Sequence, residues 1–180
     1  MATRRHAKPR FGVSREASHS EGRHSRPETS STTVTSFVDT NILVYAEDKD
    51  ESEKHAIARD LIVELWRTRD GVVSVQVLQE FFVTVTRKIK RSLSTGKALD
   101  IVREYLTWRV VDNTSALLVA AVELQQKAQL SFWDAMVVQA AIDAGCERLY
   151  SEDLNDGQRF GTLQIANPFA RTKPKGRRSG

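Results

Sequence analysis

Between residues 36 and 170, short runs rich in β-branched and aromatic residues alternate with longer stretches whose apolar residues recur at helical spacing. Strands that alternate with helices along a chain are typical of a parallel sheet covered by helices. The pattern therefore predicts an α/β fold with a mostly parallel central sheet.

The boundaries of these elements can be placed from turn and capping signals. We expect helices at 40–46, 51–69, 75–89, 95–108, 113–128 and 131–144. We expect strands at 36–38, 72–74, 110–111, 148–150 and 163–165. Gly71 is expected to stop the second helix, in which Ala56, Leu61, Val63 and Leu65 supply apolar positions, and Gly145 is expected to close the last helix.

The two ends of the chain differ in composition from this body. Residues 1–35 and 171–180 are rich in polar and basic residues and poor in large apolar ones, so they cannot bury enough surface to offset chain entropy. We predict two disordered basic tails around one domain, 36–170. The formal net charge is +4 for the whole chain, +4 for residues 1–35 and +5 for residues 171–180, which leaves a net charge of −5 on residues 36–170. The tails either contact polyanions or only add solubility.

The composition also indicates a compartment. The longest apolar runs, such as Phe81-Phe82-Val83, are far shorter than the roughly 20 residues of a membrane span. The N-terminus lacks the apolar region of a secretory signal. Cys146 is the one cysteine, which excludes an internal disulfide and fits a reducing environment. We expect a cytoplasmic protein with no membrane contact.

Acidic residues follow two of the expected strands. Asp39 stands where the first strand gives way to a helix, and Asp153 follows the strand 148–150 closely. Ligands of open α/β sheets bind beyond the carboxyl ends of the strands. Each residue also has a structural explanation: Asp39 as a helix N-cap, and Asp153, with Ser151 and Asp156, as part of a turn.

Two further carboxylates lie on helices of apolar character. Glu80 projects between Val77 and Val83, where a buried carboxylate is costly unless something positive meets it, although this edge of the helix can equally face water. Asp134 shares the stretch 132–142 with only one other polar residue, so this helix should lie in the core. A capping box with Ser131 explains the position of Asp134 but not its apolar surroundings.

The four carboxylates gain their meaning as a set. Carboxylates gathered in one crevice repel each other unless a cation neutralises them, and hard oxygen ligands favour Mg²⁺ or Mn²⁺. Such ions bind a phosphate, stabilise the leaving oxygen and activate the attacking water. The set therefore predicts a metal-dependent nuclease with Asp39, Glu80, Asp134 and Asp153 as its catalytic and metal-binding residues.

Several motifs carry a family resemblance. They are Phe37-Val38-Asp39-Thr40-Asn41, then Glu80, then Phe132-Trp133-Asp134-Ala135, and finally Tyr150-Ser151-Glu152-Asp153-Leu154-Asn155-Asp156-Gly157-Gln158. Over residues 36–170 the chain resembles a PIN domain, and especially the VapC-type toxins of bacterial and archaeal toxin–antitoxin pairs.

This resemblance implies a three-layer α/β/α fold and a Mg²⁺- or Mn²⁺-dependent endoribonuclease that cleaves single-stranded RNA. It further implies a homodimer and inhibition by a cognate antitoxin. The four carboxylates match the family's acidic positions, with Asp39 and Asp134 the leading candidates for direct metal ligands. Ser151 matches a recurring hydroxyl, and we count Asn41 and Asp156 as supporting residues. The N-terminal stretch departs from the family pattern, and both a misassigned start codon and an added RNA- or partner-binding arm would explain it.

Two other functions are consistent with parts of the sequence. A non-catalytic module that binds RNA or a protein is one, although a degraded site would usually have lost a carboxylate. A phosphatase with Asp39 as nucleophile is the other, and Asn41 weakens it because that chemistry requires a second Asp there.

Contacts to RNA have their own candidates. The helix that contains Glu80 is followed by a cluster of basic residues, Arg87, Lys88, Lys90 and Arg91. These side chains could guide an RNA backbone toward the site, or they could simply be cations favoured at a helix C-terminus. Trp108 and Trp133 are candidates for base stacking, and we expect Trp133 in the core.

Overall fold

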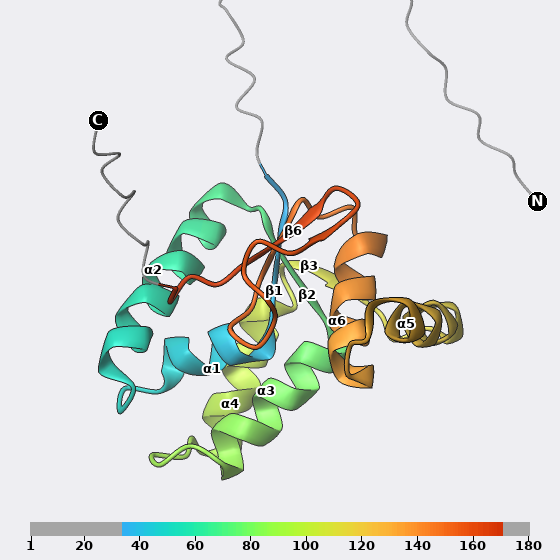
Figure 1. The fold of residues 1–180 in the computed structure, drawn as a ribbon. Coiled ribbons are helices and arrows are strands. Elements are labelled where there is room, and N and C mark those ends of the chain that lie inside the picture. Colours follow the sequence, from blue (N-terminus) through green and yellow to red (C-terminus); the bar gives the residue numbers. More distant parts are fainter. Residues whose placement is uncertain (1–33, 171–180) are drawn as a thin grey trace, which may run out of the picture. The chain divides into compact units, whose positions relative to one another are not determined.

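The computed structural model describes residues 34–170, which form a six-stranded sheet and six helices (Figure 1). The strands are β1 (Ser36–Val38), β2 (Gly71–Ser74), β3 (Arg109–Val111), β4 (Arg148–Tyr150), β5 (Arg159–Phe160) and β6 (Leu163–Ala166). Apart from residues 34 and 35, the two predicted basic tails lie outside the described residues.

The strands lie in the order β3-β2-β1-β4-β6-β5. All neighbours pair in parallel except β5 and β6, which are antiparallel. At the centre, Phe37 of β1 is in register with Val72 on one side and Leu149 on the other. Every residue of β1 and β2 is buried, as expected for parallel strands covered on both faces.

The helices are α1 (Thr40–Glu47), α2 (Ser52–Thr68), α3 (Val75–Arg87), α4 (Thr95–Tyr105), α5 (Ser115–Ala128) and α6 (Phe132–Asp143). α1 packs on α2 and α3, and α5 packs on α6. In Figure 1 the helices α2 and α6 lie on opposite sides of the strands. The predicted three-layer α/β/α fold is confirmed. None of the helices in residues 34–170 is long and apolar enough to cross a bilayer.

The helices begin where their capping residues predict. Ser74, Ser94, Thr114 and Ser131 each accept a hydrogen bond from the backbone N–H three residues later. These bonds satisfy donors that have no partner inside the helix. The sequence therefore located the starts of α3, α4, α5 and α6 to within two residues.

The role predicted for Gly71 was wrong. α2 ends at Thr68, the C-cap residue Arg69 adopts a left-handed conformation with φ 63°, and Gly71 is the first residue of β2. Gly71 is needed because the Trp108 ring lies against it: a Cβ added here would come within 2.3 Å of Cζ3 of Trp108. In α2, Ala56 and Val63 are exposed rather than core residues. The short strand β5 was also missed.

Candidate active site

The carboxyl end of the sheet provides the crevice for the site. From β1 the chain continues to β2 on one side and later places β4 on the other. Adjacent strands whose connections diverge in this way leave a ligand crevice beyond their carboxyl ends. Asp39 directly follows β1 in this crevice, and Ser151 and Asp153 follow β4.

One pocket of about 310 Å³ collects the four predicted carboxylates. Asp39, Glu80, Asp134 and Asp153 all line it, together with residues from α1, α3 and α6. Among the described residues, no Lys, Arg or His lines this pocket. The structure thus brings together four acidic side chains from distant parts of the chain, and no basic residue within 34–170 lines the pocket beside them.

Asp39 is the buried member of this set, with 9% of its surface exposed. Its Oδ1 accepts a hydrogen bond from the Thr40 N–H at 2.6 Å, and its Oδ2 accepts from the Ser151 hydroxyl at 2.7 Å. Burial, with a smaller contribution from the charges of Asp153 and Glu80, raises the pKa of Asp39 from 3.8 to about 6 against these two bonds. The hydrogen bonds alone do not compensate the charge of this carboxylate.

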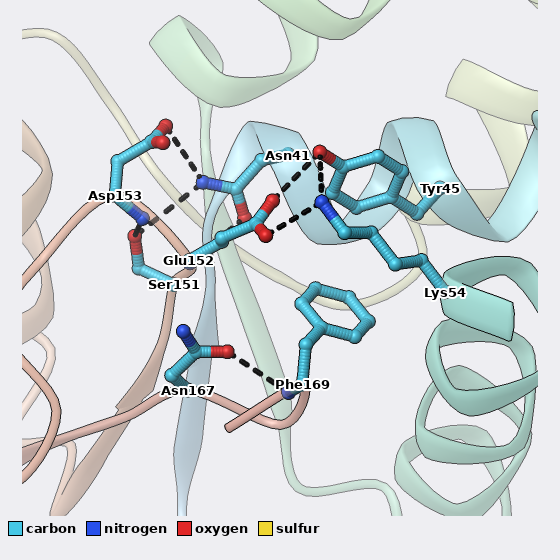
Figure 2. Close-up of polar contacts among 8 residues, drawn as sticks. All are labelled: Asn41, Tyr45, Lys54, Ser151, Glu152, Asp153, Asn167 and Phe169. Atoms are coloured by element: carbon cyan, nitrogen blue, oxygen red, sulfur yellow. Dashed lines mark hydrogen bonds and ion pairs between the residues drawn. The ribbon is translucent and has the colours of Figure 1, made fainter. Parts of the chain in front are cut away.

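Asn41 joins the two strand ends. Its amide Nδ2 donates to Oδ2 of Asp153 at 3.0 Å (Figure 2). The same Nδ2 donates to Oδ2 of Asp39 at 3.2 Å, and the Asn41 Oδ1 accepts from the Glu152 N–H at 3.3 Å. A neutral amide therefore holds two carboxylates in place without neutralising either.

Glu80 reaches the pocket from α3. Its Oε1 accepts from Gln76 Nε2 at 2.9 Å and its Oε2 accepts from the Thr40 hydroxyl at 3.3 Å. Both partners are neutral, whereas the sequence had suggested that a buried Glu80 carboxylate would need a positively charged partner. Gln76, only 3% exposed, was missed although it precedes Glu80 by one helical turn, a spacing at which side chains meet.

Asp134 both takes part in the capping of α6 and lines the pocket. The Ser131 hydroxyl accepts from the Asp134 N–H at 3.1 Å and donates to Asp134 Oδ2 at 2.7 Å, which is the capping arrangement. The same side chain is half-buried and lines the pocket. The following residues 135–138 are buried, so the prediction of a core helix is confirmed.

Two predicted positions lie differently. Asp156 does not line the pocket; its Oδ1 accepts from the Asn167 N–H at 2.9 Å, which joins the loop after β4 to the residue that follows β6. The expectation that Trp133 lies in the core was wrong, because 60% of its surface is exposed. A helix that is apolar nearly all round gives no sequence signal for which side chain of its first turn faces out.

A hydrogen-bonded group that the sequence did not reveal anchors the loop after β4 (Figure 2). Lys54 Nζ lies 2.6 Å from Oε1 of Glu152, and the Tyr45 hydroxyl donates to Oε2 of Glu152 at 2.6 Å. Lys54 also donates to the Tyr45 hydroxyl at 3.0 Å. Burial would raise the pKa of Glu152, but the bonds from Lys54 and Tyr45 outweigh it and lower this pKa. Because Glu152 stands between Ser151 and Asp153, this group ties both to α1 and α2.

Replacing Lys54 with Met should therefore destabilise the domain. We expect the free energy of unfolding at pH 7 to fall by about 1–2 kcal/mol, since the change removes a charged hydrogen-bond donor from a partly buried group. Urea unfolding followed by circular dichroism measures it. Lys127→Met is the matched control, because Lys127 is exposed and lies 3.9 Å from Glu123. Equal losses in the two variants would contradict this role of Lys54.

The donor set of the pocket fits a hard divalent cation in charge and in chemistry, since carboxylate oxygens are the ligands that Mg²⁺ and Mn²⁺ prefer. Within residues 34–170, no three acidic, His or Cys side chains converge closely enough to form a preformed ligand set. This spacing is consistent with the repulsion between like charges that have no cation between them. Gln76 and Ser131 each hold one carboxylate, Glu80 and Asp134, while Asn41 holds both Asp39 and Asp153.

The fold and the pocket define a class: an α/β/α domain that gathers carboxylates at the carboxyl edge of a parallel sheet. The family model of the PIN domain matches residues 36–156, and the chain belongs to the PIN domain family. No curated protein matches the sequence significantly.

Solved structures with a similar fold come from bacterial toxin–antitoxin systems. VapC20 of Mycobacterium tuberculosis, a sarcin–ricin loop cleaving toxin, is 22% identical, with a TM-score of 0.51 over 63% of this chain and 86% of that one. A chain of a toxin–antitoxin complex from Klebsiella pneumoniae is 18% identical, with a TM-score of 0.55 over 74% and 98%. A chain of VapBC2 from Rickettsia felis, bound to a DNA fragment from its promoter, is 20% identical, with a TM-score of 0.54 over 73% and 97%. At these identities the likeness shows the fold.

Proposed function

We propose that this protein is a metal-dependent endoribonuclease that hydrolyses phosphodiester bonds of single-stranded RNA. The observation that carries the proposal is the pocket in which four carboxylates meet and which no Lys, Arg or His of the described residues lines. Such a pocket attracts divalent cations, and membership of the PIN domain family supports the same chemistry.

The residues have distinct roles in this proposal. Asp39 and Asp134 bind the cation directly, and Glu80 and Asp153 complete the acidic set. A bound Mg²⁺ or Mn²⁺ supplies a Lewis acid for the phosphate and lowers the pKa of the attacking water. Ser151 and Asn41 orient Asp39 through its Oδ2, and Gln76 fixes Oε1 of Glu80. Oδ2 of Asp39 accepts two of these bonds, whereas its Oδ1 accepts only one, from the Thr40 N–H, and so keeps a lone pair for a cation.

The test is cleavage of a labelled single-stranded RNA by the full chain. We expect cleavage with Mg²⁺ or Mn²⁺, none after addition of EDTA, and recovery when the metal is restored. Asp134→Asn should lower the rate at least about 100-fold while circular dichroism shows a folded protein, because the amide retains an oxygen that accepts from Ser131 but no charge. If RNA stays intact and calorimetry detects no Mg²⁺ or Mn²⁺ binding, the alternative of a non-catalytic interaction module holds instead.

The raised pKa of Asp39 predicts how metal affinity depends on pH. The cation binds the charged carboxylate, whereas below about pH 6 the metal-free protein carries Asp39 increasingly in its neutral form. We expect the Mn²⁺ affinity to change little from pH 8 to 7 and to fall about tenfold per pH unit well below pH 6. Calorimetry at pH 5, 6, 7 and 8 measures this fall. An affinity that stays constant down to pH 5 would contradict Asp39 as a ligand.

The proposal extends to partners and setting. We propose that the protein is the cytoplasmic toxin of a toxin–antitoxin pair, that a cognate antitoxin inhibits it, and that it forms a homodimer. The similar folds of two toxin–antitoxin complexes support the pairing, and three exposed apolar side chains on α5, Leu118, Val119 and Val122, are available to a dimer interface. Light scattering on the full chain tests the dimer. Co-expression with a small protein encoded immediately upstream, followed by the RNA assay, tests inhibition.

A further inference from the structure

A second cavity adjoins the carboxylate pocket. It has a volume of about 460 Å³ and shares Gln76, Glu80, Thr84 and Trp133 with that pocket. Its remaining wall comes from α3 and the residue that ends it: Gln79, Val83 and Lys88. A chain-like ligand bound at the carboxylates can therefore continue into this second cavity without leaving the surface.

Among the four residues that line both cavities, Trp133 is unusual in its exposure to solvent. It is 60% exposed, although burial of an indole is strongly favourable. The Phe132 ring supports it edge-to-face, with centroids 5.1 Å apart. A supported, exposed indole offers a flat π-face, which is the group on which unpaired nucleobases stack in proteins that bind single strands.

The charge around the second cavity suits a polyanion. Lys88 lines it, and Arg87 and Lys90 stand beside Lys88 at the end of α3. This positive group is local, since residues 36–170 carry a net −5. Lys88 and Trp133 line this cavity together with Glu80, and the other three carboxylates line the adjoining pocket. A cation and an aromatic face in one cavity suit a nucleotide strand, in which phosphates and bases alternate.

We propose that the second cavity is a nucleobase subsite in which Trp133 stacks on one base of the substrate strand and Lys88 contacts a neighbouring phosphate. The subsite rests on the proposed function, because it places the strand so that its next phosphodiester reaches the carboxylate pocket. It also assigns Trp133, which the acidic site does not use, a part in selecting unpaired RNA.

The test measures binding rather than cleavage. The full chain carrying Asp39→Asn is titrated without divalent metal against labelled single-stranded RNA, and anisotropy gives the Kd. Adding Trp133→Ala should weaken binding about tenfold or more, and Trp133→Phe should recover most of the loss. Val63→Ala is the control for an exposed apolar side chain, since Val63 is 58% exposed and lines neither of the two cavities. It should change Kd less than twofold.

Two further probes identify what Trp133 and Lys88 contact. If Trp133 stacks on a base, one abasic position in the strand should remove the difference in Kd between the proteins with and without Trp133→Ala, and double-stranded RNA should show no difference at all. Lys88→Ala should reduce the slope of log Kd against log salt concentration by about 1, whereas Lys127→Ala should not change it.

The outcomes separate this subsite from the proposed function. Wild-type cleavage together with unchanged RNA binding by Trp133→Ala would overturn the subsite alone. A Trp133-dependent Kd in a protein that never cleaves RNA would support the subsite and overturn the nuclease. A loss that persists on every abasic strand, or a Trp133→Ala protein whose only change by light scattering is its oligomeric state, would overturn base stacking in favour of an interface between copies.

Discussion

Replacing Asp39 with Asn is expected to abolish RNA cleavage and, at the same time, to make the metal-free protein more stable. Asp39 is buried between Ser151 and Thr40, and its pKa is raised from 3.8 to about 6 mainly by that burial. The negative charge of Asp39 that would bind the cation therefore destabilises the metal-free folded protein. An amide has similar size and no charge, so it removes the cost and the metal site together.

The sign of the stability change follows from proton binding. Below its raised pKa, Asp39 is protonated in the native protein while the unfolded chain still carries it charged, so stability from this residue increases as pH falls from 7 toward 4. At pH 7 the difference of about two pKa units corresponds to about 3 kcal/mol. Asn forfeits part of this because its single side-chain oxygen can accept from Thr40 or from Ser151 but not from both, whereas Asp39 accepts one bond on each oxygen. We expect a gain of about 1–3 kcal/mol in the free energy of unfolding.

Urea unfolding in EDTA at pH 5 and pH 7 measures the gain, and the RNA assay measures the loss. The gain should shrink between pH 7 and pH 5. Asp112→Asn serves as the control, since Asp112 is exposed and lies outside the pocket. It should leave both stability and cleavage nearly unchanged. An Asp39→Asn protein that cleaves RNA at the wild-type rate, or that is destabilised at pH 7, would contradict this account of the site.

Gly71→Ala is expected to destabilise the fold by about 3 kcal/mol or more. A methyl group at this position would lie 2.3–2.6 Å from three carbons of the Trp108 ring. That ring cannot retreat easily, because it packs edge-on against Trp66 and Tyr105 with centroid distances of 5.0 and 5.3 Å. Overpacking of this kind forces side chains out of their rotamers or shifts the backbone, and here the backbone is the buried strand β2.

Gly96→Ala is the matched control for Gly71→Ala. Gly96 lies in the first turn of α4, and a Cβ added there meets nothing within 4 Å. Alanine is a better helix former than glycine, so this variant should gain up to about 1 kcal/mol. Thermal unfolding of both variants gives the comparison. A Gly71→Ala protein as stable as the wild type would show that Trp108 can relocate at little cost.

The fold was predictable because its signals are local. The alternation of short β-branched runs with helical periods indicated the parallel sheet and the places where helices begin. β5 was missed because a strand of two residues has no period to detect. The end of α2 was predicted to within one residue, but its stop was assigned to Gly71 because Arg69 adopts the left-handed conformation that usually selects Gly or Asn.

The site was predictable in part, for the same reason. Asp39 and Asp153 follow parallel strands, and the carboxyl ends of parallel strands lie at the same edge of the sheet regardless of how the loops run. The groups that hold them are contacts between distant segments: Lys54 meets Glu152, and Asn41 meets Asp153, across about a hundred positions of sequence. No local pattern encodes such contacts. Trp133 was misplaced because a nearly uniform apolar helix does not show which side of its first turn is open to solvent.

The pocket described above draws its four carboxylates from positions 39, 80, 134 and 153, which lie on or beside β1, α3, α6 and β4. No single helix or strand supplies more than one of them. A chain still being synthesised, with β4 inside the ribosome, therefore lacks Asp153, Ser151 and the strand that completes the crevice. If the protein cleaves RNA as proposed, this activity appears only once the last parallel strands have joined the sheet, so a growing chain would spare the RNA on which its own synthesis depends.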